Sequence, residues 1–355
     1  MKIAQRGLCS SVFAVTTLLA ACGGGGDGGS APPIQSAPSL AITTANRDLV
    51  SHDAVAGVMA LSSTTSIPLG SPASVAGRAT AQGSGAALSS SWSGRIVGAT
   101  IGHLRAALPA AGRPHALAVM GPVTEACMVS GSTTTTAEDR DDNGTLSAGD
   151  AGTVVYSNCR DTSTEMVNGT SSVVFSAIED TYLAAHVTAI GMSTAATGHS
   201  LTIDGSMLME VWTPDGVTTT IRTTAEGPVR ATISTHVPFE DTVTLESGFA
   251  IEESIDLSVA APVSGGTPGR TLTTLAGRMS SAAAGGTFDV ATIETAPMTR
   301  YHAEDYPSAG TVRVAGRSGV LVLTTTSASS VLLNLDWNDD GRYETSELKA
   351  WEWLI

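Results

Sequence analysis

The feature that most constrains this chain is a long succession of short runs rich in Val, Thr and Leu, which begins near Ala116. Gly, Asn, Asp and Pro separate the runs, and several runs alternate between apolar and polar residues, as a strand with one buried face does. Similar openings to strands at 167–170, 203–206 and 275–278 recur too loosely for a true repeat array. The pattern predicts a mainly β fold, with one large, curved antiparallel meander sheet or an open barrel.

Composition supports this fold class and limits the partners. Charged residues make up 14% of the chain and aromatic residues 4%, so the core must use small and β-branched side chains. The formal charge is −15, and it becomes −17 if Lys2 and Arg6 are removed with a signal peptide. A surface this acidic repels phosphate backbones, so we expect no nucleic acid partner.

Helical periodicity appears in two stretches before the predicted strands. The first covers residues 42–61, with Thr43 or Thr44 as its N-cap, and the second ends at Pro109. Their apolar stripes are Val50, Ala54, Val58 and Leu61, and then Val97, Ile101, Leu104 and Leu108. The spacing predicts two amphipathic helices, so residues 40–115 form a helical cover segment and residues 116–355 a β-rich domain.

The N-terminus has the features of an export signal. Residues 1–21 combine a short basic region with an apolar stretch too short to span a bilayer, and they end just before Cys22. Residues 22–39 contain a glycine run and prolines, which is typical of a flexible tether. We expect cleavage before Cys22 and lipid attachment to its thiol; the alternative is an ordinary signal peptide cut nearby.

Two further cysteines, Cys127 and Cys159, stand outside this region. In an oxidising compartment such a pair most often forms a disulfide. The alternatives are two free thiols or a metal pair, but the His and Cys neighbours that zinc needs are missing. We therefore expect a disulfide.

Two twelve-residue segments fit the EF-hand calcium loop, in which alternate residues turn oxygens toward one ion and Gly at position 6 permits the bend. The ligands expected in the first are Asp139, Asp141, Asn143, Thr145, Ser147 and Asp150. Those expected in the second are Asp336, Asn338, Asp340, Arg342 through its carbonyl, Glu344 and Glu347. The second fits better, because a Glu at position 12 reaches an ion bidentately more easily than Asp. For each loop the alternative is an acidic surface hairpin without an ion.

The surroundings of the loops favour a structural role for calcium. The first loop lies between predicted strands, and the second lies between a strand and a short C-terminal helix with Leu348, Trp351 and Ile355 on one face. A calcium sensor needs two helices that swing apart, and neither loop has them. With Trp337 and Trp353 nearby, this chain end is expected to form a hydrophobic plug rather than a ligand platform.

Taken together, these motifs resemble those of Gram-negative outer-membrane lipoproteins to which no activity is attached. The resemblance rests on the lipobox with its glycine run, the segments 41–46, 143–150 and 156–159, and the closing calcium-type loop. It implies a β-rich envelope protein, held at the outer membrane by its N-terminal lipid, and supplies no catalytic residues.

Known enzyme signatures are missing from the sequence. It contains no G-x-S-x-G elbow, no H-E-x-x-H motif and no Gly-rich phosphate loop. The sequence therefore favours a non-catalytic, calcium-stabilised envelope lipoprotein with a structural or binding role. Two alternatives stay open: a periplasmic carrier of lipids or other hydrophobic ligands, and a hydrolase with structural calcium.

Overall fold

The computed structural model describes residues 38–61, 119–143, 145–160, 163, 165–196, 199–213, 217–235 and 239–354. These residues lie within one compact unit, Ala37–Ile355. The strands described are β1 (Val119–Ala126), β2 (Ser130–Glu138), β3 (Ala151–Arg160), β4 (Glu165–Ile178), β5 (Tyr182–Ala196), β6 (His199–Trp212), β7 (Thr218–Ala225), β8 (Val229–Thr235), β9 (Phe239–Leu245), β10 (Ala250–Asp256), β11 (Arg270–Ser281), β12 (Gly286–Thr292), β13 (Met298–Tyr301), β14 (Thr311–Ala315), β15 (Val320–Ser327), β16 (Ser330–Asp336) and β17 (Thr345–Ala350). The helices described are α1 (Arg47–Leu61) and α3 (Trp351–Leu354).

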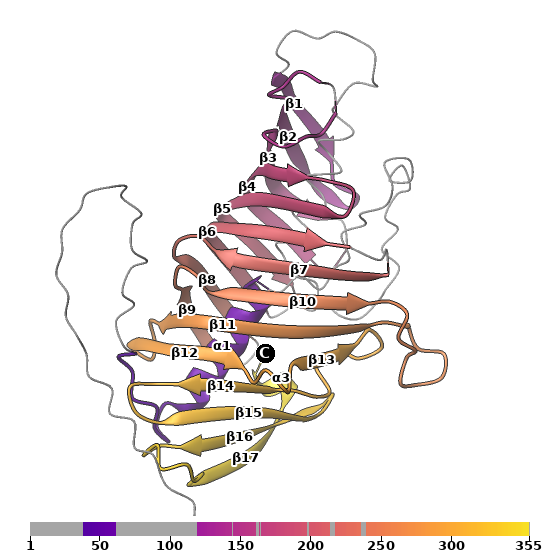
Figure 1. The fold of residues 1–355 in the computed structure, drawn as a ribbon. Helices are drawn as coiled ribbons and strands as arrows, with labels where there is room; N and C mark the ends of the chain where they lie inside the picture. Colours follow the sequence, from indigo (N-terminus) through magenta and orange to yellow (C-terminus); the bar gives the residue numbers. More distant parts are fainter. Residues whose placement is uncertain are drawn as a thin grey trace, which may run out of the picture. The chain divides into compact units, whose positions relative to one another are not determined.

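All the described strands belong to one antiparallel sheet that runs from β1 at one end to β17 at the other and follows the order of the chain except at β7, which pairs with β10 (Figure 1). The two end strands, β1 and β17, each have one pairing partner in the described part of the chain, β2 and β16 respectively. The predicted mainly β fold with a large, curved antiparallel meander is confirmed.

Some rows of the sheet consist of two strands placed end to end. β6 pairs with both β7 and β8, β11 pairs with both β10 and β9, and β12 and β13 both pair with β11. Between β7 and β8 the chain contains Pro228, which has no N–H to donate to the ladder. These interruptions let long strands bend, so they contribute to the curvature of the sheet.

A glycine of the neighbouring strand lies opposite two of these junctions between end-to-end strands. Gly205 in β6 has φ +142°, and a Cβ there would lie 2.8 Å from the Cα of Val229. Gly277 in β11 has φ +151°, and its Cβ would lie 2.6 Å from the Cα of Phe249. The prediction that 203–206 and 275–278 open strands is therefore wrong: both lie inside strands, where only glycine permits the close approach of the two backbones.

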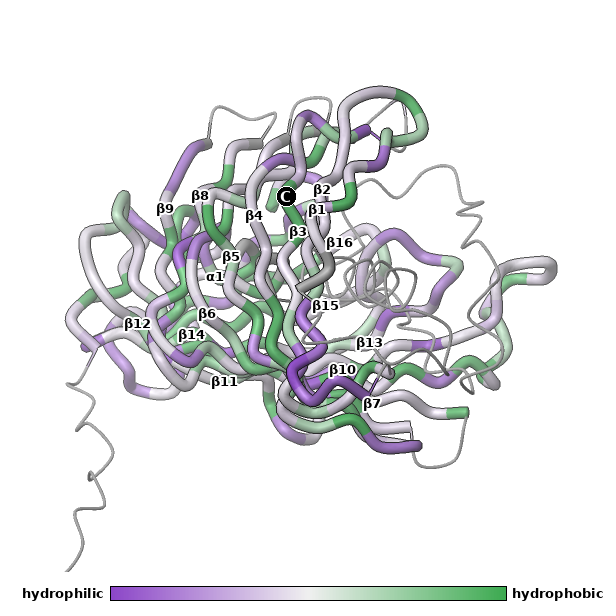
Figure 2. The backbone as a smooth tube through the Cα atoms, turned by 90° about the horizontal axis from the view of Figure 1, so that it is seen from above, coloured by the Kyte–Doolittle hydropathy of each residue, from purple (hydrophilic) through white to green (hydrophobic). Residues whose placement is uncertain are grey.

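The first predicted helix is confirmed as α1. It contacts β8, β9, β11, β15 and α3, and Figure 2 shows it among the curving strands. The predicted N-cap is wrong: regular helix begins only at Arg47, and the bond of 3.3 Å from the N–H of Ala45 to the Thr43 hydroxyl belongs to a turn before it. The second predicted helix, with residues 97–108, lies outside the described residues.

The short C-terminal helix is confirmed, but its predicted extent is wrong. Leu348 belongs to β17, where it pairs with Leu332, and 61% of its surface is exposed. Trp351 is buried, and its indole N–H donates to the carbonyl of Pro307 at 3.1 Å. Position 348 faces outward because the side chains of an edge strand alternate between the two faces of the sheet.

None of the helices in the described part of the chain is both long and apolar enough to cross a membrane.

Candidate metal sites

The first acidic loop, residues 139–150, closes the hairpin between β2 and β3. Glu138 pairs with Ala151, so all twelve loop residues lie beyond the end of the ladder. The backbone N–H of Phe175 in β4 donates to the carbonyl of Asp150 at 2.9 Å. The adjacent strand therefore holds the last residue of the loop in place.

Three aspartates come together in this loop. Asp139, Asp141 and Asp150 each contribute a carboxylate oxygen that lies within 4.8 Å of the other two. Asp139 and Asp150 are buried, whereas Asp141 is exposed. The N–H groups of Arg140 and Ser147 donate to the two oxygens of Asp150 at 2.9 Å and 2.7 Å. These bonds hold the acid at position 12 inside the cluster.

The three other expected ligands of the first loop are engaged in its internal hydrogen bonds. The side-chain oxygen of Asn143 accepts from the N–H and from the hydroxyl of Thr145, both at 2.6 Å. The Ser147 hydroxyl donates to Asp141 at 2.9 Å, and this bond is the main cause that lowers the pKa of the Asp141 carboxyl. Asp141 therefore keeps its negative charge further into the acid range than a free aspartate.

The second acidic loop, which begins at Asp336, closes the hairpin between β16 and β17. Leu335 pairs with Thr345, so the tenth position of the predicted twelve already belongs to β17. The N–H of Glu344 donates to the carbonyl of Leu335 at 3.0 Å and closes the turn. The loop that connects β16 and β17 is thus shorter than the calcium loop predicted from the sequence.

Asp336, Asp340 and Glu344 form the acidic cluster of the second loop, with one oxygen from each within 4.8 Å of the others. Asp336 is buried and accepts from the N–H groups of Asp340 at 3.2 Å and Gly341 at 2.8 Å. The Glu344 carboxylate accepts from the N–H of Trp337 at 2.9 Å. The acid at position 9 therefore faces the acid at position 1.

Glu347, the expected bidentate ligand, is not a member of this cluster. It lies in β17 opposite Leu333, and its carboxylate pairs with the guanidinium of Arg47 in α1 and, at 2.5 Å, with Lys349 Nζ. The hydrogen bond with Lys349 is the main cause that lowers the pKa of Glu347. Its role as a metal ligand stays a prediction.

Two other expected ligands, Asn338 and Arg342, lie within the turn of the second loop. The Asn338 side-chain oxygen accepts from the N–H of Asp340 at 3.0 Å, and the N–H of Arg342 donates to Asp340 at 2.9 Å. Both bonds run between alternate residues, which is the spacing that turns the oxygens of such a loop to one side.

The two loops share one unusual backbone feature. The residues at position 4, Asp142 and Asp339, have φ of 54° and 59°, in the left-handed region that Asp tolerates better than most residues. Gly341 at position 6 has φ 83°. Since Asp at position 4 takes nearly the same φ in both loops, this conformation is a property of the local sequence.

The donor chemistry of both clusters fits a hard cation. Each cluster consists of carboxylates and contains neither His nor Cys, which disfavours zinc. Three carboxylates this close repel one another, and a bound cation would offset the repulsion. The guanidinium of Arg140 pairs with Glu138 at 3.1 Å instead. The described residues therefore contain two acidic clusters that could hold a metal ion.

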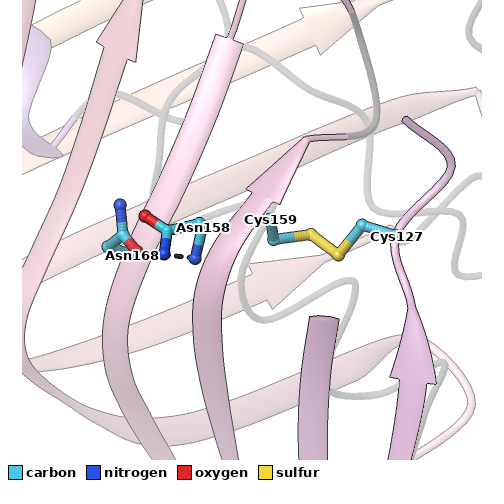
Figure 3. Close-up of a disulfide and its surroundings, with 4 residues drawn as sticks. All are labelled: Cys127, Asn158, Cys159 and Asn168. Atoms are coloured by element: carbon cyan, nitrogen blue, oxygen red, sulfur yellow. Dashed lines mark hydrogen bonds between the residues drawn. A yellow bond between two sulfur atoms is a disulfide. The ribbon is translucent and has the colours of Figure 1, made fainter. Parts of the chain in front are cut away.

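The predicted disulfide between Cys127 and Cys159 is confirmed, with 5.5 Å between the two Cα atoms (Figure 3). It joins the open end of the β2–β3 hairpin, opposite the first acidic loop. Asn158, next to it, has φ 48°, and its N–H donates to the side chain of Asn168 in β4 at 2.7 Å. The first loop is thus part of a hairpin that is covalently closed at its other end.

Part of the predicted site lies outside the described residues, and two buried acids of the structure were not among the predicted site residues. Cys22 and the tether up to residue 37 are outside the described residues. The buried carboxyl groups of Asp53 and Asp241 were not foreseen. The helical stripe around Val50 placed Asp53 near the apolar face, and this was the only signal in the sequence that could have indicated its burial.

Comparison with protein-family models, with curated proteins and with solved structures finds no match for this chain.

Proposed function

We propose that the protein is a non-catalytic envelope lipoprotein whose two acidic loops bind calcium and stiffen the two ends of its sheet. The observation that carries this proposal is the gathering of three carboxylates in each of two hairpin loops whose aspartates at position 4 share a left-handed backbone. Calcium fits because it takes six to eight oxygen ligands in flexible geometry, and extracellular sites bind it at about 0.1–1 mM.

The position of the loops gives calcium a mechanical role. The first loop closes the β2–β3 hairpin, next to the end strand β1, and the second closes the β16–β17 hairpin, at the opposite end of the sheet. End strands open most easily, because they have a neighbour on one side only. An ion in the second loop would hold the end strand β17 to β16, and an ion in the first loop would hold β2 to β3, so that fraying of β1 would not spread further into the sheet.

Calorimetric titration of the full-length protein with calcium, after removal of metal with a chelator, tests this proposal. We expect two binding events with Kd of about 0.1–1 mM, and chelation should lower the melting temperature. At 10 mM calcium each site should add about 1.4–2.7 kcal/mol to the free energy of unfolding. Magnesium should bind more weakly, since it demands stricter octahedral geometry.

Matched variants separate metal binding from a general effect of charge. Asp139→Asn and Asp336→Asn remove the buried carboxylates at position 1, and each should abolish one binding event. Asp142→Asn and Asp339→Asn remove the same charge from the same loops at position 4, outside the two clusters, and should leave both events in place. If all four variants weaken binding equally, calcium acts only as a diffuse counter-ion and the proposal fails.

Anchoring through Cys22 and the two alternative functions need separate readouts. Cys22→Ser should move the protein from the membrane fraction to the soluble fraction, and retention in washed outer membranes would contradict lipid anchoring.

Native mass spectrometry of the protein released from detergent reports bound metal and bound lipid together. A stoichiometric lipid mass would favour the carrier over the structural role, and hydrolysis of generic ester or peptide substrates would favour the hydrolase.

A further inference from the structure

A pair of aspartates lies beneath helix α1, far from both acidic loops. The side chain of Asp53, in the middle of α1, is completely buried, and neither of its carboxylate oxygens has a hydrogen-bond partner among the described residues. Asp241 of β9 and Ser281 of β11 are also buried, and both lie close enough to act on the Asp53 carboxyl. An ionised carboxylate without donors is very costly in such a place.

The packing of α1 explains why Asp53 lies there. Asp53 and Gly57 are one turn apart on the same helix face. A Cβ at Gly57 would collide with the end of the Met279 side chain, so the helix backbone lies directly against β11 at that point. Met279 and Ser281 are successive inward positions of β11. The close contact at Gly57 therefore places Asp53 one turn away, above Ser281 and the adjacent Asp241.

The hydrogen bonds around Asp241 decide which of the two acids carries the negative charge. Asp241 accepts from the Ser281 hydroxyl at 2.7 Å, from the N–H of Thr242 at 2.7 Å and from the N–H of Ala283 at 2.9 Å. Three donors stabilise a negative charge on Asp241. The Ser281 hydroxyl donates to Asp241, and the lowering that Ser281 exerts on the pKa of Asp53 is outweighed by burial.

We propose that the buried carboxyl of Asp53 holds a proton while α1 is docked, and that this proton acts as a latch between α1 and the strands β9 and β11, which loosens as the medium turns alkaline. Burial, together with the charge of Asp241, raises the pKa of Asp53 to about 8. In an undocked helix the same carboxyl has an ordinary pKa of about 3.9. Docking is therefore strongest in acid, weakens about tenfold for each pH unit above roughly 4, and levels off above about 8.

Other charged groups of α1 and its neighbours act elsewhere on the helix. They are Arg47, Asp48 and His52 on α1, and Glu347 and Lys349 on β17. Burial lowers the pKa of His52, whose Nδ1 lies 3.2 Å from the Leu354 carbonyl oxygen, so its protonation opposes docking in acid. The effect of His52 thus has the opposite sign to that of Asp53, and the two must be separated by experiment.

Loosening of α1 would leave the chain before it in place. The N–H of Leu40 donates to the carbonyl of Thr287 at 3.0 Å, and that of Ile42 donates to the carbonyl of Ser318 at 2.8 Å. Neither bond involves a titratable side chain. The latch would therefore move α1 relative to the sheet without releasing the segment that joins it to the N-terminal part of the chain.

Hydrogen exchange of the α1 backbone in the full-length protein tests the latch. Asp53→Asn keeps the shape of the side chain but cannot ionise, so α1 in this variant should exchange more slowly than in the wild type. Compared at the same pH, the ratio of protection between variant and wild type should rise about tenfold per unit from pH 5 to pH 8 and then stay constant. Taking this ratio cancels the contribution of His52 and the intrinsic pH dependence of exchange.

Asp48→Asn is the matched control, because it removes a partly exposed carboxylate from the same helix. Because Asp48 also raises the pKa of His52, the protection ratio of this variant should change with pH only below about pH 7, where His52 takes up a proton, and should be constant from about pH 7 to pH 8. Infrared difference spectra should show a protonated carboxyl band in the wild type at pH 7 that disappears at pH 9.5 and is missing in Asp53→Asn. A protection ratio for Asp53→Asn that is equal at pH 5 and pH 8, or the absence of that band, would overturn the proposal. Neither readout depends on calcium.

Discussion

The two acidic loops begin alike and end differently. In both, an acid at position 1 is buried and the residue at position 4 takes a left-handed conformation. At position 12 they diverge: Asp150 is buried within its cluster, whereas Glu347 lies in β17 and pairs with Arg47. Asp has the shorter side chain of the two, yet it is Asp150, and not Glu347, that joins the acidic cluster of its loop.

The point at which each hairpin closes explains this difference. The β2–β3 ladder ends at Glu138 and Ala151, which leaves position 12 free to turn back toward position 1. The β16–β17 ladder continues to Leu335 and Thr345, so position 12 is already fixed by strand pairing. Whether an acid at position 12 joins the cluster therefore depends less on the length of its side chain than on whether its backbone is paired in the ladder.

The loops also differ in what stabilises the rest of their hairpins. A disulfide closes the far end of the β2–β3 hairpin, whereas β17 is tied to α1 by the ion pair between Glu347 and Arg47. A disulfide limits the unfolded chain at any pH, while an ion pair that is open to solvent on the Glu347 side contributes less and is partly screened by salt. The first loop therefore has the firmer support.

The largest expected effect comes from removing that support. Cys127→Ser combined with Cys159→Ser should lower the free energy of unfolding by roughly 3–4 kcal/mol in the chain-entropy model. It should also weaken calcium binding at the first loop and leave the second loop unchanged. Denaturant unfolding and calorimetric titration measure the two effects.

Equal weakening of both loops in the double serine variant would contradict the separation of the two hairpins. The single variants serve poorly as controls, because each leaves a free thiol. Reduction of the wild-type protein is the better control, and it should reproduce the effect of the double substitution.

The next effect concerns position 12 directly. Asp150→Asn should weaken calcium binding at the first loop by about tenfold to a hundredfold, the effect of losing one charged interaction of about 1.5–3 kcal/mol. Glu347→Gln should change the second site by less than about threefold, since its carboxylate is engaged with Arg47 and Lys349. Glu344→Gln should weaken the second site as strongly as Asp150→Asn weakens the first.

Titration calorimetry on the three variants tests this order. If Glu347→Gln weakened the second site more than Glu344→Gln, the ion would have to draw Glu347 away from Arg47 and change the pairing of β17. That result would restore the ligand set expected from the sequence.

Local features of the molecule could be predicted from the sequence, and features that depend on distant strands could not. The ligand spacing of Asp139 and Asp336 and the pairing of Cys127 with Cys159 need only short-range patterns or a process of elimination. The closing points of the hairpins depend on ladder pairing, so Glu344 and Glu347 could not be ranked. The environment of Asp53 depends on β9 and β11, which lie far along the chain.

The smallest expected effect concerns what the loops share. Asp142→Gly and Asp339→Gly replace residues with positive φ by the residue that adopts this conformation most easily. Each should raise the free energy of unfolding by less than about 1 kcal/mol, because the added freedom of glycine in the unfolded chain offsets part of the gain. Since the two backbones have the same conformation at position 4, the two changes in melting temperature should be equal, unlike the effects at position 12.

Asp142→Asn and Asp339→Asn are the controls, because they keep a side chain suited to this conformation. They should leave the melting temperature unchanged. A loss of stability in one glycine variant alone would show that this aspartate supports its loop through its carboxylate and that the two turns are not equivalent.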